Sequence, residues 1–139
     1  MSKRKGVISW PIEDDPSKLR NSLDAIFGKQ KHPQFDTWVV NNGIRIRSAI
    51  GQNVIAVDGG KVVFADDFKS YGKTVIIDHS GGFYTVYGNL DEIAVKDQQN
   101  IEKGEIIGMV GVSIYSQNAS LYFEFRKDGI PQNPLVWLK

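Results

Sequence analysis

Residues 54–87, with the sequence VIAVDGGKVVFADDFKSYGKTVIIDHSGGFYTVY, contain the pattern that decides the fold. Short runs of β-branched and aromatic residues alternate there with breaks that contain glycine. Such runs are typical of β-strands, and glycine at the breaks allows the positive φ angles that tight turns need. The pattern predicts a mostly β domain, with strands at residues 54–57, 60–65, 73–78 and 83–87.

Two further segments continue this pattern towards the C-terminus. Residues 101–110 resemble a hairpin-like corner, and residues 121–126 have the pattern of another strand. Because side chains alternate between the two faces of a strand, we expect Leu121, Phe123 and Phe125 to enter the core. The opposite face is expected to line a groove with Ser120, Tyr122, Glu124 and Arg126.

Residues 17–27 show helical periodicity instead. A start signal at residues 14–16 precedes apolar residues at helical spacing, namely Leu19, Leu23, Ile26 and Phe27. We expect a short amphipathic helix, whose apolar stripe either seals one end of the sheet core or forms a lid that faces a partner. Residues 28–37 are expected to form the loop that follows it.

The composition fits one globular domain. The chain has 139 residues, of which 41% are hydrophobic and 24% charged, and this is enough for a core of ordinary size. We expect residues 1–5 to be an N-terminal tail and residues 6–139 to be the domain. A net charge of +1 gives no general attraction to nucleic acid, so no nucleic-acid partner is expected.

Cysteine content and targeting signals give little information about the compartment. The chain has no cysteine, which excludes disulfides and suits an oxidising compartment as well as the cytosol. No apolar stretch approaches the roughly 20 residues of a membrane span, and no signal peptide precedes Gly6. If the native protein is exported, we expect this sequence to be a fragment whose leader has been removed.

Several motifs carry a resemblance to a known family. Residues 41–45 read NNGIR and residues 120–124 read SLYFE, where zinc peptidases of the lysostaphin/LytM type have His-x-Gly-Ile-Asp and His-Leu-His-Phe-Glu. Residues 51–62 and 71–79 are similar to that family's Gly-Thr-Pro-Val-x-Ala-x-x-x-Gly-x-Val and Tyr-Gly-x-x-Val-x-Ile-x-His. The resemblance implies a LytM/lysostaphin-like antiparallel β-sheet domain of the barrel-sandwich hybrid type, with a short N-terminal helix.

The family's metal ligands and acid–base residues are replaced in this chain. The five changed positions are Asn41, Arg45, Asn89, Ser120 and Tyr122. A catalytic zinc ion needs about three imidazole, thiolate or carboxylate ligands, and a guanidinium repels a divalent cation. We therefore expect no zinc cofactor and no catalysis. The two histidines, His32 and His79, lack ligand spacing and could join Asp78 only in an adventitious metal site.

One branch of the family is more similar than the others. Residues 120–126 (SLYFEFR), with Asn133-Pro134 and Trp137-Leu138 at the end, resemble EnvC-type murein hydrolase activators, whose LytM domains are catalytically dead. The resemblance implies that the chain activates an N-acetylmuramoyl-L-alanine amidase during cell-wall remodelling and cell division, in the periplasm or another extracytoplasmic space. It also implies peptidoglycan and a membrane division complex as partners, the latter through an N-terminal coiled coil missing from this sequence.

We expect the partner to bind in the groove where the family has its zinc site. Tyrosine and arginine are frequent in interface hot spots, and strand alternation puts Arg45 and Arg47 on one face, where they suit carboxylates. The alternatives are a solvated vestigial cleft, a peptidoglycan-binding module without a protein client, a residual zinc murein endopeptidase and, from the turn at residues 103–104, a carrier domain. The expected groove residues are Asn41, Asn42, Arg45, Arg47, Tyr71, Tyr87, Asn89, Ser120, Tyr122, Glu124 and Arg126.

Overall fold

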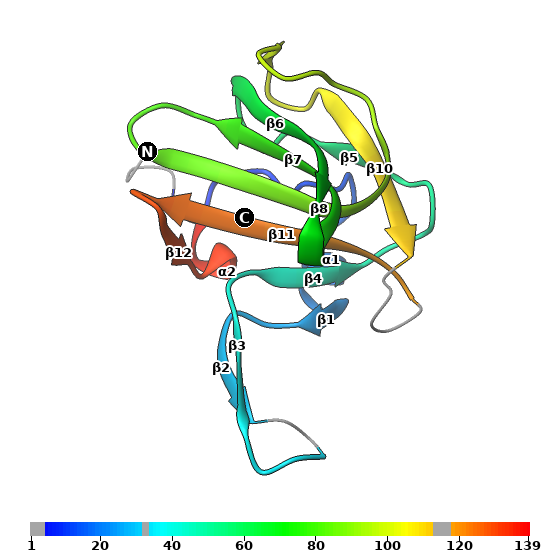
Figure 1. The fold of residues 1–139 in the computed structure, drawn as a ribbon, viewed down its shortest axis with the longest axis vertical. Helices are drawn as coiled ribbons and strands as arrows, with labels where there is room; N and C mark the ends of the chain where they lie inside the picture. The colour runs from blue at the N-terminus through cyan, green and yellow to red at the C-terminus, as the bar shows by residue number, and fades with distance from the viewer. Residues whose placement is uncertain (1–4, 32–33, 113–117) are drawn as a thin grey trace.

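The computed structural model describes residues 5–31, 34–112 and 118–139. In this part of the chain, ten strands form one antiparallel sheet and two more form a separate hairpin, β2–β3 (Figure 1). The main path of the sheet is β1-β4-β11-β10-β8-β7-β6-β9, with β5 added to β10 and β12 added to β11. The strands are β1 Leu23–Ala25, β2 Gly28–Lys31, β3 Trp38–Asn41, β4 Ile44–Arg47, β5 Asn53–Ile55, β6 Gly60–Phe68, β7 Gly72–Asp78, β8 Phe83–Ile93, β9 Asn100–Ile101, β10 Ile106–Val112, β11 Ala119–Lys127 and β12 Ile130–Gln132.

Helical segments are short. They are α1 Pro16–Arg20, a 3₁₀ turn at Lys69–Tyr71 and α2 Pro134–Trp137. Among the described residues, no helix has the length and the apolar character that crossing a membrane would require.

The predicted strands and the mostly β fold are confirmed. The four strands expected in residues 54–87 correspond to β5, β6, β7 and β8, although β6 and β8 run further than the sequence pattern suggests. Two glycines show why the breaks contain this residue. Gly82 has a φ of 84°, and a Cβ at Gly60 would lie 2.3 Å from the carbonyl oxygen of Asp78 on the neighbouring strand.

The core forms on one face of β11, as the strand alternation predicts. Leu121, Phe123 and Phe125 are fully buried. The ring of Phe125 stacks on Trp137 of α2 with ring centroids 4.7 Å apart, and the ring of Phe123 lies 5.4 Å from that of Tyr87 on β8. These contacts fix β11 against β8, and therefore set which side chains its opposite face presents.

The predicted helix at residues 17–27 is wrong beyond its first turn. Asp15 caps α1, as the start signal predicts, but the helix ends at Arg20. The chain then forms strand β1 on the edge of β4, and a salt bridge of 2.7 Å between Arg47 and Asp24 joins the two strands. Pairing with an open sheet edge outweighs the helical spacing of a few apolar residues, because such spacing is a weak signal on its own.

Two other expectations are also corrected. Residues 28–37 are not simply a loop, because β2 pairs with β3 and the resulting hairpin projects from the main sheet beside β1 and β4 (Figure 1). Residues 101–110 are not a hairpin, because β9 pairs with β6 whereas β10 pairs with β5, β8 and β11. A short turn between β9 and β10 sends the chain to a different part of the sheet.

Candidate functional site

The candidate site begins where β4 and β11 lie side by side. In this antiparallel pair Arg45 is opposite Tyr122, so residues from two motifs far apart in sequence meet across the ladder. The guanidinium carbon of Arg45 lies 5.1 Å from the centre of the Tyr122 ring, within the range of a cation–π contact. The structure thus brings together two of the five positions at which the family's ligands are changed.

A row of aromatic rings continues from Tyr122. Tyr71, in the turn between β6 and β7, stacks on Tyr122 with ring centroids 4.6 Å apart and an interplanar angle of 25°. Phe68 stacks on Tyr71 at 5.5 Å, and Phe64 meets Phe68 edge-on at 5.7 Å. The sequence motifs point to the two tyrosines but not to the two phenylalanines. Their even spacing, which puts both on one face of β6, is the signal that could have found them.

Glu124 holds the site face of β11 together. Its fully buried carboxylate accepts a hydrogen bond from the Tyr122 hydroxyl at 2.5 Å and another from Nε of Arg126 at 2.6 Å. Burial and the hydrogen bond with Glu124 raise the pKa of the Tyr122 hydroxyl, which therefore stays a neutral donor. Because a buried carboxylate must be paired, Tyr122 and Arg126 are held in fixed orientations.

The face of β11 that carries Ser120, Tyr122, Glu124 and Arg126 is mostly buried, whereas side chains that line an open groove would be exposed. Tyr122 is 7% exposed, and Arg126 keeps 29% of its side-chain surface exposed. Ser120 is fully buried, and its hydroxyl has no hydrogen-bond partner among the described residues. Of the four side chains expected on this face, three are linked by the hydrogen bonds of Glu124, whereas Ser120 lines none of the cavities described below.

Two cavities adjoin the Tyr71–Tyr122 stack, and together they are named the groove. The first, of about 440 Å³, is lined by the base of the hairpin and by β4, including Asn41, Asn42 and Arg45. The second, of about 510 Å³, lies over β6, β7 and β8 and is mostly apolar, with Glu124 and Arg126 in its lining. Tyr71 lines both cavities and therefore lies between them.

Besides Ser120, three of the predicted groove residues line neither cavity. Tyr87 is fully buried in the core, where burial raises the pKa of its hydroxyl to about 12. The side-chain amide of Asn89 donates a hydrogen bond to the carbonyl oxygen of Ser120 at 2.8 Å. Arg47 is paired with Asp24, as described above. Each of these side chains stabilises the fold and adds nothing to the two cavities.

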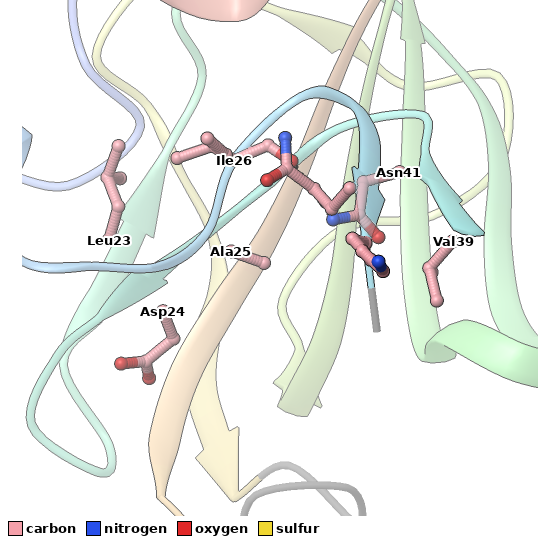
Figure 2. Close-up of a pocket in the computed structure, with 8 residues that line it drawn as sticks. Leu23, Asp24, Ala25, Ile26, Val39 and Asn41 are labelled. Atoms are coloured by element: carbon pink, nitrogen blue, oxygen red, sulfur yellow. Dashed lines mark hydrogen bonds between the residues drawn. The ribbon is translucent and has the colours of Figure 1, made fainter. Parts of the chain in front are cut away.

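A third cavity, of about 350 Å³, adjoins the first (Figure 2). Figure 2 shows the residues of β1 and Ile26 along one side and Val39 and Asn41 along the other. The side-chain amide of Asn41 donates a hydrogen bond to the carbonyl oxygen of Ile26 at 3.0 Å. Asn41 lines this cavity as well as the first cavity of the groove, so the hydrogen bond fixes the base of the hairpin as a groove wall.

The side chains around the first cavity do not fit a zinc ion. At the positions of the family's ligands, the cavity is lined by the amide of Asn41, the guanidinium of Arg45 and the neutral phenol of Tyr122. None of these groups belongs to the imidazole, thiolate and carboxylate set that zinc takes in proteins. Within residues 5–31, 34–112 and 118–139, no group of three or more His, Cys, Asp or Glu side chains is placed to hold a metal ion.

The histidines do not supply such a site either. His79 has both ring nitrogens in hydrogen bonds, one with the carbonyl oxygen of Gly59 at 2.8 Å and one with the hydroxyl of Thr85 at 2.7 Å. His32, the other member of the adventitious site considered from the sequence, lies outside the described residues. His79 therefore acts as a structural link between β7, β8 and the turn before β6.

The chain is similar to known proteins over most of its length. The model of Peptidase family M23 matches residues 39–134. The murein hydrolase activator EnvC of Escherichia coli K12 is 34% identical over 134 residues, which are 96% of this chain and 29% of that protein. The DD-carboxypeptidase/endopeptidase Mpg of Neisseria meningitidis serogroup B is 35% identical over 113 residues, 81% of this chain and 26% of that protein. A zinc-containing peptidase from Vibrio cholerae has the same fold, with a TM-score of 0.80 and 24% identity over 94% of this chain and 40% of that chain.

These similarities confirm the resemblance to EnvC-type activators and the fold class that the sequence motifs predict. The chain spans less than a third of the length of either curated relative. One of these relatives is named as an activator and the other as a peptidase, so the names alone do not decide between the two activities.

Proposed function

Because this chain belongs to peptidase family M23, we propose that it is a non-catalytic member that binds and activates an N-acetylmuramoyl-L-alanine amidase during cell-wall remodelling and cell division. The observation that carries the proposal is the stack of Arg45, Tyr122 and Tyr71 in the groove. The 34% identity to a protein named as a murein hydrolase activator supports it.

Arg45 is the strongest argument against catalysis. A permanent cation stands where the family has a carboxylate, and it repels a metal ion at 4 Å by about 4 kcal/mol for each unit of metal charge at an effective dielectric constant of about 20. Its guanidinium is also held over the ring of Tyr122. A zinc ion would therefore have to displace this contact and overcome the repulsion, with no carboxylate or imidazole ligand gained in return.

The groove has the features of a surface that binds a protein. Its second cavity is lined by apolar and aromatic side chains such as Phe64, Phe68 and Val86, with the partly exposed Arg126 beside them. Aromatic residues and arginine in pockets of this kind are the typical anchors of protein interfaces. Since the hydrogen bonds with Glu124 already fix Tyr122 and Arg126, a partner would bind them at a low cost in side-chain entropy.

Activation by binding requires only a difference in affinity for two states of the partner. We propose that the chain binds the active conformation of the amidase more tightly than the inactive one. A preference of about 100-fold would raise an active population of about 1% to roughly one half. The chain itself would form and break no covalent bond in this process.

A dye-release assay on labelled peptidoglycan tests the proposal. We expect no release by the chain alone, little release by a purified candidate amidase alone, and strong release by the mixture. Each amidase of the organism that produces this chain is tested in turn. If no mixture releases more dye than the amidase alone, the proposal is refuted.

A second candidate function is residual endopeptidase activity, which the 35% identity to the Neisseria peptidase favours. It requires release by the chain alone, and a chelator must abolish that release. A third, a peptidoglycan-binding module without a protein client, requires that the chain sediments with purified peptidoglycan and leaves every amidase unaffected.

We further propose that the domain comprises residues 6–139 and that it acts in the periplasm or another extracytoplasmic space. Peptidoglycan and a membrane division complex are proposed as additional partners, the latter through a coiled coil outside this sequence. The greater length of the relatives is consistent with such a segment. Fractionation of cells that produce the native protein with a C-terminal tag tests the compartment, since a cytoplasmic signal would contradict it.

A further inference from the structure

The hairpin β2–β3 presents an exposed face of mixed apolar and cationic character. Lys29 is opposite Val40 and Lys31 is opposite Trp38, and residues directly opposite each other in a strand pair share a face. These four residues are named the hairpin face. Trp38 is 57% exposed and Val40 is 67% exposed, so both keep most of their apolar surface in water in this structure.

The charges of the hairpin face lie close to its apolar side chains. The ammonium group of Lys29 is 4.9 Å from the centre of the Trp38 ring. Lys31 makes an exposed salt bridge of 3.1 Å with Asp36, which lies in the turn of the hairpin rather than on this face. Because Lys31 is paired with this carboxylate, the face offers Lys29 beside its apolar side chains, and it therefore complements a ligand that has an apolar group and a negative charge side by side.

The hairpin face is continuous with the groove. Val40 lines the first cavity together with Arg45, Tyr71 and Tyr122. Trp38 is two residues further along the same strand, roughly 7 Å from Val40 at the usual rise per residue. The hairpin projects away from the main sheet (Figure 1), so a segment that leaves the first cavity in this direction passes over Val40 and then Trp38.

From this continuity and this charge pattern we propose that the hairpin face is the outer half of the hydrolase-binding surface. It takes an amphipathic segment of the amidase that places an apolar side chain against Trp38 and Val40 and a carboxylate beside Lys29. The proposal rests on the proposed function, because it extends the same interface beyond the groove.

Binding of each purified amidase of the organism to variants of the chain tests this inference. We expect Trp38→Ala to raise the dissociation constant of the activated amidase by about tenfold or more, as for an interface hot spot. Ile130→Ala is the matched control, because Ile130 is an apolar residue that is 63% exposed in β12, outside the groove and the hairpin. It should bind like the unchanged chain.

A charge variant keeps the test valid if Trp38→Ala disturbs the hairpin. Lys29→Glu with Lys31→Glu should slow association several-fold and weaken its dependence on salt, while Trp38 stays in place. Lys96→Glu with Lys103→Glu makes the same change of charge at exposed positions elsewhere and should have no such effect.

The outcomes separate this inference from the proposed function. If the unchanged chain activates an amidase and the hairpin variants bind it equally well, the groove assignment stands and the hairpin assignment is refuted. If the variants bind the amidase normally but no longer sediment with purified peptidoglycan, the face binds a glycan polymer instead and the inference is also refuted. If the unchanged chain neither binds nor activates any amidase, both proposals fail.

Discussion

Tyr71 stacks on Tyr122 with ring centroids 4.6 Å apart, and Tyr122 stands at one of the positions where the family pattern has a histidine. The two residues are held differently. Tyr122 is fixed from β11 by its hydrogen bond to Glu124, whereas Tyr71 belongs to the short 3₁₀ turn between β6 and β7. Tyr71 is therefore the member of the pair that can be changed with the smaller effect on the fold.

Replacing Tyr71 tests the groove directly. Tyr71→Ala removes the stack and merges the two cavities that Tyr71 lines. We expect amidase activation in the dye-release assay to fall by about tenfold or more, with a melting temperature close to that of the unchanged chain. Tyr71→Phe keeps the ring and is the matched control, which should activate normally. Full activation by Tyr71→Ala would show that the stack is a vestige without a binding role.

The hydrogen bonds of Glu124 with Tyr122 and Arg126 predict that a change at Arg126 lowers the stability of the fold as well as binding. Arg126→Glu removes the salt bridge of 2.6 Å and adds a second negative charge beside a fully buried carboxylate. We expect the free energy of unfolding in urea to fall by about 3 kcal/mol, as when one partner of a buried pair is lost. Lys96→Glu makes the same charge change at an exposed site and should cost less than about 0.5 kcal/mol.

The sequence motifs present Arg126 only as a groove residue, whereas the structure also pairs it with the fully buried Glu124. If Arg126→Glu unfolds at the same urea concentration as the unchanged chain, Glu124 does not depend on this partner. Activity losses of Arg126 variants should accordingly be interpreted only after their stability has been measured.

The sequence predicts the strands of the sheet well, because the alternation of apolar and polar side chains and the glycines at turns are local signals. Leu121, Phe123 and Phe125 enter the core for that reason. Alternation does not reveal what covers the second face of a strand, and so it presents Ser120 as a groove-lining residue although its side chain is fully buried and lines neither cavity. The same limit applies to Tyr87, which motif position assigns to the groove and the structure places in the core.

Pairing between distant segments is the other feature that local signals miss. Leu23 lies at helical spacing from its apolar neighbours, yet it pairs with Ile46 of β4. Residues 28–31, which are expected to belong to a loop, form strand β2 and pair with β3. Neither partner strand can be identified from periodicity within one window of sequence.

The raised pKa of the buried Tyr87 hydroxyl predicts that the fold loses stability at alkaline pH. The hydroxyl accepts a hydrogen bond from the backbone N–H of Val57 at 3.2 Å and another from the hydroxyl of Thr85 at 2.8 Å, and burial raises its pKa to about 12. The unfolded chain ionises this group near its ordinary pKa of about 10, so the folded state holds the proton over a range in which the unfolded state has lost it. The stabilisation is therefore complete below pH about 10 and is lost as the pH rises towards about 12.

Urea unfolding at a series of pH values measures this effect. We expect a loss of about 3 kcal/mol between pH about 10 and 12 from Tyr87, since one pKa unit corresponds to about 1.4 kcal/mol. Tyr87→Phe should be less stable than the unchanged chain at neutral pH by about 1 to 2 kcal/mol, because the N–H of Val57 loses its acceptor. It should also lose less stability over the alkaline range. An equal alkaline loss in both proteins would assign the effect to Tyr122 and Tyr71, whose pKa values are also raised by burial.

Restoring the family's ligands tests directly whether the changed side chains are what excludes zinc. Asn41, Arg45 and Tyr122 line one cavity, so three ligands placed at these positions would line the same cavity. We expect the triple variant Asn41→His, Arg45→Asp and Tyr122→His to retain about one zinc ion per chain after dialysis, and the unchanged chain to retain far less than one. The double variant Asn41→His and Tyr122→His, which keeps Arg45, is the matched control, and its zinc affinity should stay weak because the guanidinium repels the ion. Metal analysis of the three dialysed proteins decides the matter. Stoichiometric zinc in the unchanged chain would revive the endopeptidase function, and tight zinc binding by the double variant would show that Arg45 is not what excludes the metal.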